Sequence, residues 1–154
     1  MRVDEIARKA RLETLSEKTD VSTLLFDYEK SRRACRIFLN WLKENGGRAS
    51  KREISQFGYL LQQGKIVEGF KYSRKSFYKT VLRRLVDLGF IELYKGHYKG
   101  RWRWVYAAII QPIPSRGPGG RNFYNMAWQI CKKWNQEWKS INISSSISRN
   151  RYEM

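Results

Sequence analysis

The spacing of apolar residues changes at Gly89, and this change constrains the fold more than any other feature of the sequence. Before Gly89 the apolar residues recur every three or four positions, which predicts amphipathic helices. After it, residues 90–94 and 102–110 are rich in β-branched and aromatic side chains, which is typical of strands. Residues 95–101 join them as a basic loop with two glycines. We therefore expect an α+β fold that is mainly α, with a small antiparallel β-hairpin.

The segment before the hairpin carries signals for two successive helices. Ser50-Lys51-Arg52-Glu53 fits a capping box, so a helix begins there and ends before Gly64. Ser73 caps a further helix, about 73–88, which Gly89 stops. The residues expected on its buried side are Phe77, Val81, Leu82, Leu85 and Leu88.

The chain divides into consecutive segments. Helical spacing predicts a short helix at 3–16, and a longer one that begins at Asp20 or Ser22 and runs to Asn45, before Gly46-Gly47. The segments are a helical N-terminal arm of balanced charge (1–30), a central domain (31–110), a Pro/Gly linker (111–121), an amphipathic C-terminal helix (122–139) and a flexible tail (140–154).

Positive charge is concentrated after the N-terminal arm. The net charge is +17, of which residues 1–30 contribute −1 and residues 31–154 contribute +18. A field of this size attracts polyanions, and nucleic acid gains affinity by releasing counterions from its phosphates. A generally solubilising surface is the alternative, but the charge is densest beside the hairpin, where residues 71–103 carry +8.

The sequence carries no sign of catalysis, of a cofactor or of a membrane segment. Cys35 and Cys131 are far apart and are expected to be buried, reduced thiols, not metal ligands. His97 has no neighbouring ligand pattern, and neither a phosphate-binding loop nor a carboxylate pair stands out. The charged N-terminus lacks the apolar core of a signal peptide, and no stretch reaches the ~18 apolar residues of a membrane span. We expect an intracellular protein that is not an enzyme.

The order helix, capped helix, capped helix, strand, basic loop, strand resembles the winged helix-turn-helix family. The resemblance covers residues 46–110, and the stretches that carry it are Ser50-Lys51-Arg52-Glu53-Ile54, Tyr72-Ser73-Arg74-Lys75-Ser76 and Leu82-Arg83-Arg84-Leu85-Val86-Asp87-Leu88-Gly89-Phe90-Ile91. It implies a winged helix with extra N- and C-terminal helices. The helix at 73–88 would then enter the major groove of DNA, and a wing at 95–103 would contact the backbone or the minor groove.

One feature departs from the family pattern. Residues 62–72 form a longer connection than the three or four residues that usually join the two helices of the motif. Because of this departure, the sequence does not determine the angle at which the two helices cross.

The candidate DNA-binding residues fall into three groups. On the recognition helix they are Lys71, Ser73, Arg74, Lys75, Ser76, Tyr78, Lys79 and Arg83. In the wing they are Lys95, His97, Tyr98, Lys99, Arg101 and Arg103. At the start of the preceding helix Ser50, Lys51 and Arg52 are expected to meet the DNA backbone.

Strand alternation separates the charged and aromatic residues of the second strand. Arg101 and Arg103 fall on one face, toward the polyanion, and Trp102 and Trp104 fall on the other. We expect the tryptophans to pack on the domain or on a neighbouring helix. Stacking of Trp102 on a base is the alternative.

The C-terminal helix has an apolar face with two interpretations. The face consists of Phe123, Ala127, Ile130, Cys131, Trp134 and Trp138. It either covers an exposed side of the domain or forms a homodimer contact, through Phe123, Ala127, Ile130, Trp134 and Trp138, that would match a palindromic site. The N-terminal arm could serve the same end or bind a protein partner.

These features together predict a sequence-specific double-stranded DNA-binding protein, a transcriptional regulator by the resemblance. One alternative is a structural component of a replication, partition or packaging complex. Another is an RNA-binding winged helix in which Tyr98 and Trp102 stack on bases. The small size and high charge also suit a mobile-element or viral protein of a thermophilic archaeon, in which case it would be virion-associated.

Overall fold

The computed structural model describes residues 20–113, 122–141 and 143, with the side chains of 122–126 excepted. The expected helix at 3–16, most of the linker and most of the tail lie outside these residues. The elements in chain order are α2 (Val21–Leu25), α3 (Glu29–Glu44), β1 (Arg48–Ser50), α4 (Lys51–Gln62), α5 (Arg74–Ser76), η1 (Phe77–Leu82), α6 (Arg83–Asp87), β2 (Ile91–Tyr98), β3 (Arg101–Ala108) and α7 (Asn122–Glu137).

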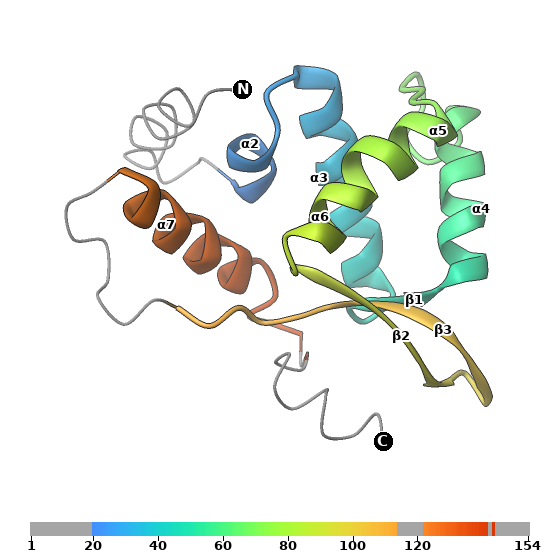
Figure 1. Cartoon of the computed structure of the whole chain (residues 1–154). Helices are drawn as coiled ribbons and strands as arrows, with labels where there is room; N and C mark the ends of the chain where they lie inside the picture. Colours follow the sequence, from blue (N-terminus) through green and yellow to red (C-terminus); the bar gives the residue numbers. More distant parts are fainter. Residues whose placement is uncertain (1–19, 114–121, 142, 144–154) are drawn as a thin grey trace.

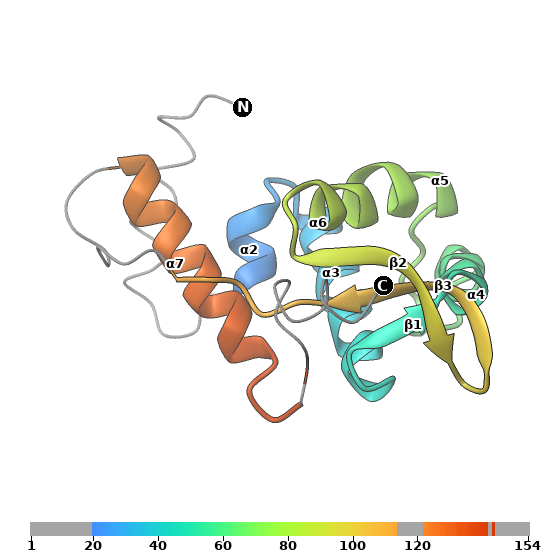
Figure 2. The same ribbon diagram turned by 60° about the horizontal axis from the view of Figure 1, so that its bottom comes forward.

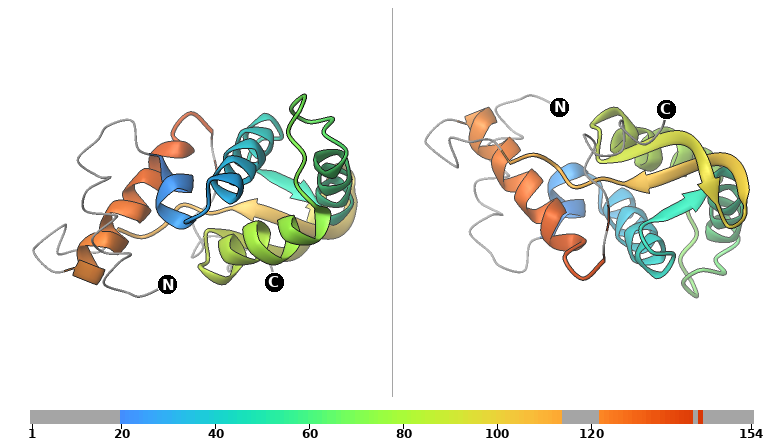
Figure 3. Two further views of the ribbon diagram at one scale, coloured as in Figure 1. Left: turned by 90° about the horizontal axis from the view of Figure 1, so that it is seen from above. Right: turned by 90° about the horizontal axis from the view of Figure 1, so that it is seen from below.

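The α+β expectation is confirmed. The three strands form an antiparallel sheet in the order β1-β3-β2. Helices α3, α4 and α5–α6 cover one face of the sheet, and the β2–β3 hairpin extends beyond them (Figure 1 and Figure 2). Helix α7 lies at the opposite end of the molecule from the hairpin tip (Figure 3).

The first described helix is not continuous with the second, so the expected unbroken helix to Asn45 is wrong. Asp20 caps α2 by accepting a hydrogen bond from the Thr23 amide at 3.1 Å. The chain then becomes extended at Phe26 and buries its ring. Arg84 donates to the Leu25 carbonyl at 2.6 Å and lies over the Phe26 ring. This tertiary contact outweighs the local helical pattern.

Strand β1 is absent from the sequence expectation, because three residues are too short to show a period. It follows the end of α3, where Gly46 has a φ of 77° and the Gly47 amide donates to the Leu42 carbonyl at 2.9 Å, a Schellman motif. Ser50 ends the strand and caps α4. The predicted capping box is confirmed, since Ser50 Oγ accepts from the Glu53 amide at 3.1 Å and Glu53 Oε1 accepts from the Ser50 amide at 3.0 Å.

The third helix runs from α5 through η1 to α6 and begins at the predicted cap. Ser73 Oγ accepts from the Ser76 amide at 3.0 Å. The middle of the helix is a π-helical turn, closed by a hydrogen bond from the Arg83 amide to the Tyr78 carbonyl. The predicted burial holds for the first four apolar residues, but Leu88 is 52% exposed. It occupies the C-cap position after the helix ends, so it does not share the buried side.

The hairpin is longer and tighter than expected. The predicted loop at 95–101 is mostly strand, because β2 and β3 pair continuously to Tyr98 and Arg101. Only Lys99 and Gly100 form the turn, and both have positive φ (49° and 79°), as in a type I′ turn. Gly96 does not interrupt the strand. The Tyr94 ring lies across it, 2.7 Å from where a Cβ would be.

Helix α7 completes the main core. Trp134 and Trp138 are 0% and 1% exposed and Ile130 is also buried. Trp134 Nε1 donates to the Ile109 carbonyl at 2.7 Å, and the Asn135 side chain bonds both the amide and the carbonyl of Gln111.

The dimer interpretation is therefore wrong for Ile130, Trp134 and Trp138, because these residues already pack inside the monomer. The alternative, that the helix covers the domain, describes the structure. Ala127 is half-buried, and the side chain of Phe123 lies outside the described residues.

An ion-pair network joins α7 to the N-terminal helices. The largely buried Glu137 carboxylate accepts hydrogen bonds from Arg36 and Lys43 of α3, and Arg36 also pairs with Asp20 at 3.0 Å. Burial raises the pKa of the Glu137 carboxyl, but the hydrogen bonds from Arg36 and Lys43 outweigh it and the net shift is downward. The network stabilises the attachment of α7 while Glu137 is charged.

Replacing Glu137 by Gln tests this attachment. We expect the free energy of unfolding at pH 7 to fall by about 1–3 kcal/mol, because Arg36 and Lys43 lose their charged acceptor. Because the pKa of Glu137 is lower in the folded protein, its charged carboxylate stabilises the fold at pH values above the unfolded pKa of about 4.3. This stabilisation is lost as the pH falls through the pKa of Glu137 in the folded protein. Urea unfolding at a series of pH values from 7 to 2 should show that the free energies of unfolding of the wild type and of Glu137→Gln become equal at low pH. The control is Glu68→Gln, at an exposed loop position, and an equal effect of both substitutions would contradict the network.

Candidate nucleic-acid interface

The exposed side of the third helix is basic. Arg74, Lys75, Lys79 and Arg83 are exposed, as is Lys71 before the helix. Within the described residues, Arg83 has the only ion pair of this group, a 3.6 Å contact with Asp87 in which both side chains are mostly exposed. Such surface pairs are weak. Most of the cations on this side are thus free to meet an external anion.

Arg74 and Tyr78 are held against the protein. Arg74 Nη2 donates to Ser55 Oγ at 2.7 Å, and its guanidinium lies 5.8 Å from the Tyr78 ring centroid. Tyr78 is half-buried and packs edge-on against Phe77. Ser76 is also half-buried, and the Ser73 hydroxyl is occupied by its cap. Arg74 is therefore exposed but held toward α4 by its hydrogen bond to Ser55.

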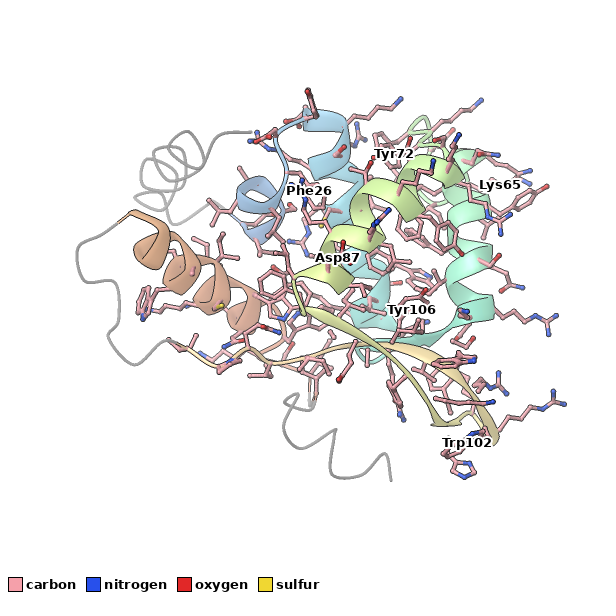
Figure 4. The ribbon with its side chains drawn as sticks, in the orientation of Figure 1. Phe26, Lys65, Tyr72, Asp87, Trp102 and Tyr106 are labelled. Carbon is pink, nitrogen blue, oxygen red and sulfur yellow. The ribbon has the colours of Figure 1, made fainter. Side chains whose placement is uncertain are left out.

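The long connection before this helix is packed in place. Phe70 and Tyr72 are buried and their rings stack with an interplanar angle of 7°. The Tyr72 hydroxyl is 3.2 Å from Ser31 Oγ on α3, and the Tyr72 amide donates to the Leu61 carbonyl of α4. Figure 4 shows Tyr72 beneath the start of α5. These contacts hold α4 and the third helix in a defined relative position, although the connection between them is longer than usual.

Gly58 allows α4 and the third helix to approach closely. A Cβ at this position would lie 3.3 Å from Arg74 Cγ, 3.5 Å from the Phe77 ring and 3.7 Å from the Tyr78 ring. A methyl group here would touch both rings at ordinary contact distance and shift Arg74 Cγ slightly, so a larger side chain must displace one of the three residues.

The hairpin residues predicted to bind DNA differ in their exposure to solvent. Lys95, His97, Lys99 and Arg101 are exposed and Arg103 is half-buried. Tyr98 is only 5% exposed, so its expected role as a wing contact is wrong.

Tyr98 is instead a structural residue beside the hairpin turn. Its hydroxyl donates to the Arg48 carbonyl at 3.3 Å, and the Arg48 guanidinium lies over its ring. Burial, followed by the hydrogen bond with Glu53, raises the pKa of Tyr98. The side chain therefore anchors the wing to β1.

A second contact ties the wing tip to α4. Lys99 Nζ donates to Glu53 Oε2 at 2.7 Å. Burial raises the pKa of Glu53, but the hydrogen bonds from Lys99 and from the Ser50 amide lower it more, to about 2. Glu53 is thus charged under all ordinary conditions and occupies the Lys99 ammonium.

The expectation that Trp102 and Trp104 pack on the domain is wrong. They are 54% and 45% exposed. Register places them on the same face of the sheet as the buried Tyr106 but nearer the hairpin tip, and Figure 4 shows Trp102 close to that tip. The His97 ring meets Trp102 edge-on at 4.9 Å, and Lys51 Nζ lies 5.7 Å from the Trp104 ring centroid.

A hollow of about 320 Å³ lies between the start of α4 and this part of β3. Its lining residues are Ser50, Lys51, Arg52, Arg101, Trp102, Arg103 and Trp104. Lys51 and Arg52 are exposed, whereas Ser50, the third residue expected to meet the DNA backbone, is buried and its hydroxyl caps α4, so that expectation is wrong for Ser50. No carboxylate lines the hollow, and within the described residues none of its four cations is in an ion pair. Sequence reasoning placed these residues on separate elements and did not bring them together.

The remaining features point to no other chemistry. Both cysteines are free thiols. Cys35 is fully buried as predicted, Cys131 only partly, and burial raises the pKa of both. In the part of the chain that the structure describes, no group of His, Cys, Asp or Glu could hold a metal ion. No described helix has the length and apolar character needed to cross a membrane.

Comparisons of the chain with models of protein families, with curated proteins and with solved structures gave no match. The site is therefore interpreted from its own residues and geometry.

Replacing Gly58 by Leu tests the close approach of the helices. The added side chain must displace Arg74, Phe77 or Tyr78, which costs about 1–3 kcal/mol by overpacking. The gain in helix propensity on replacing glycine, about 1 kcal/mol, offsets part of this. We expect a net loss of stability in urea unfolding. Gln56→Leu, at an exposed position of the same helix, should change stability by less than about 0.5 kcal/mol. Equal stability of both variants would contradict the tight packing at Gly58.

Proposed function

We propose that the protein is a winged helix-turn-helix that binds double-stranded DNA sequence-specifically and regulates transcription. The observation that carries the proposal is the row of exposed cations on a Ser73-capped helix beside a projecting basic hairpin. The chain order α3, β1, α4, α5–α6, β2, β3 supports the proposal, because it keeps the succession of helices and hairpin on which the sequence resemblance rests. The start of α5, α4 and the hairpin tip all lie at the end of the molecule away from α7 (Figure 1 and Figure 3).

In this proposal the third helix lies in the major groove, which admits one α-helix. Lys75 and Lys79 neutralise phosphates and set the orientation on the duplex. Arg74 contacts a base edge after exchanging its Ser55 partner for the base. Arg101, at the end of the hairpin, contacts the backbone or the minor groove.

A second candidate is a structural component of a nucleoprotein complex. The observation that favours it is the engagement of Arg74 and Tyr78 within the protein, because these are the side chains best suited to contact bases. The lysines that remain free bind phosphate and carry no sequence information.

Selection of bound sequences from a random duplex pool distinguishes the two functions. A regulator should enrich a motif and bind it on the order of a thousandfold more tightly than random duplex. A structural protein should show little difference and a steep loss of affinity with salt. Absence of duplex binding at low salt would overturn both.

Substitution of Arg74 by Ala tests the role of the third helix. Affinity for the selected site should fall by about 1–3 kcal/mol and the sequence preference should relax. Lys75→Ala, a phosphate contact, should weaken binding equally on selected and random duplex. Ser55→Ala serves as the control, because it removes the internal partner of Arg74 and should not weaken binding. Equal losses on both duplexes for Arg74→Ala would show that Arg74 meets phosphate only.

A further inference from the structure

The tryptophans at the hairpin are only partly covered by the protein, through the contacts of Trp102 with His97 and of Trp104 with Lys51. Trp102 and Trp104 stand on the face that carries the core residue Tyr106, yet about half of each side chain is in contact with solvent. Exposed apolar area of this kind, bordered by charge, marks a binding surface. The two indoles stand two residues apart on the same face of β3, and we call this pair the aromatic platform.

The platform opens onto a basic hollow of suitable size. Its volume of about 320 Å³ falls at the lower end of small-molecule sites, which span roughly 300–1,000 Å³. Lys51, Arg52 and Arg101 are exposed around it, and Arg103 has a buried Nε without a hydrogen-bond partner in the described residues. Lys51 already lies over the Trp104 ring, 5.7 Å from its centroid. The hollow thus combines flat apolar surface with positive charge.

The hollow also lies along an open strand edge. Strand β1 pairs with β3 only from Ser50↔Val105 to Arg48↔Ala107, where the chain turns into α4. Residues 101–104 therefore have no strand neighbour on that side within the described residues. Backbone donors and acceptors on an unpaired edge can bond the polar edge of a flat ligand.

We infer that this hollow binds an unpaired nucleotide of a DNA strand next to the duplex, with its base stacked on Trp102 or Trp104. The inference rests on the proposed function, since the duplex is held by the third helix. Inside a duplex the neighbouring base pairs cover both faces of every base, so away from the duplex ends only an unstacked base can lie on an indole. Lys51, Arg52 and Arg101 hold the adjoining phosphates. Stacking tolerates any base, so this contact adds affinity for the structure of a junction and not for its sequence.

The experiment compares affinity for a blunt duplex and for the same duplex with a short thymidine overhang at either end. Wild-type protein should bind one overhang duplex roughly five- to hundredfold more tightly than the blunt one, the range expected for one stacked base. Trp102→Ala combined with Trp104→Ala should abolish this preference and keep the affinity for the blunt duplex. Trp102→Phe with Trp104→Phe should retain much of it, because phenyl rings also stack. Circular dichroism establishes that each variant is folded.

The matched control is Trp128→Ala, because Trp128 is a half-buried tryptophan on α7 at the far end of the molecule. It should leave the preference unchanged. Equal binding of blunt and overhang duplexes by wild type, or a preference that survives loss of both tryptophans, would overturn the inference while leaving duplex binding intact. Tighter binding of an RNA overhang than of a DNA overhang would overturn the assignment to a DNA strand. Loss of all duplex binding would refute the proposed function instead.

Discussion

Three phenylalanine rings hold the helical layer together, and the rest of the structure depends on this contact. Phe38 of α3, Phe57 of α4 and Phe77 of the third helix meet with centroid distances of 5.1–5.4 Å, and all three are almost fully buried. Aromatic contacts of this kind add to the energy of burial. Because each ring comes from a different helix, their packing determines which side of the third helix faces the core. The basic side is thereby left facing solvent.

The positive charges at the two ends of the molecule differ in whether they have carboxylate partners. Near α7, Arg36 and Lys43 are paired with Glu137 and serve stability. At the hairpin end the lysines and arginines of α4, the third helix and β3 mostly lack carboxylate partners within the described residues. The exceptions at this end are Arg83, which has an exposed contact with Asp87, and Lys99 in the turn, which pairs with Glu53. A fold that needed these charges only for solubility would have no reason to gather them around a hollow with exposed indoles.

Sequence reasoning succeeded where a single residue type has a local structural role. The caps at Ser50 and Ser73 and the stop at Gly89 were predicted because hydroxyl caps and positive-φ glycines act within a few residues. It failed where contacts between residues far apart in the sequence determine the local structure. Burial of Phe26 interrupts a helix, and β1 exists only because β3 pairs with it. Strand alternation correctly separated Trp102 from Arg101, but alternation cannot show whether a helix covers a given face.

The two-residue turn at Lys99 and Gly100 has a consequence for recognition. A flexible basic loop would lose conformational entropy on meeting a ligand, and this loss would weaken binding. Here the strands pair up to the turn, and the Tyr98 and Lys99 contacts fasten the tip to β1 and α4. The entropy of ordering the wing is lost during folding, before any ligand arrives. The hairpin is therefore a preformed arm, and if the proposed function holds, its position relative to the third helix would determine the shape of the nucleic acid that fits.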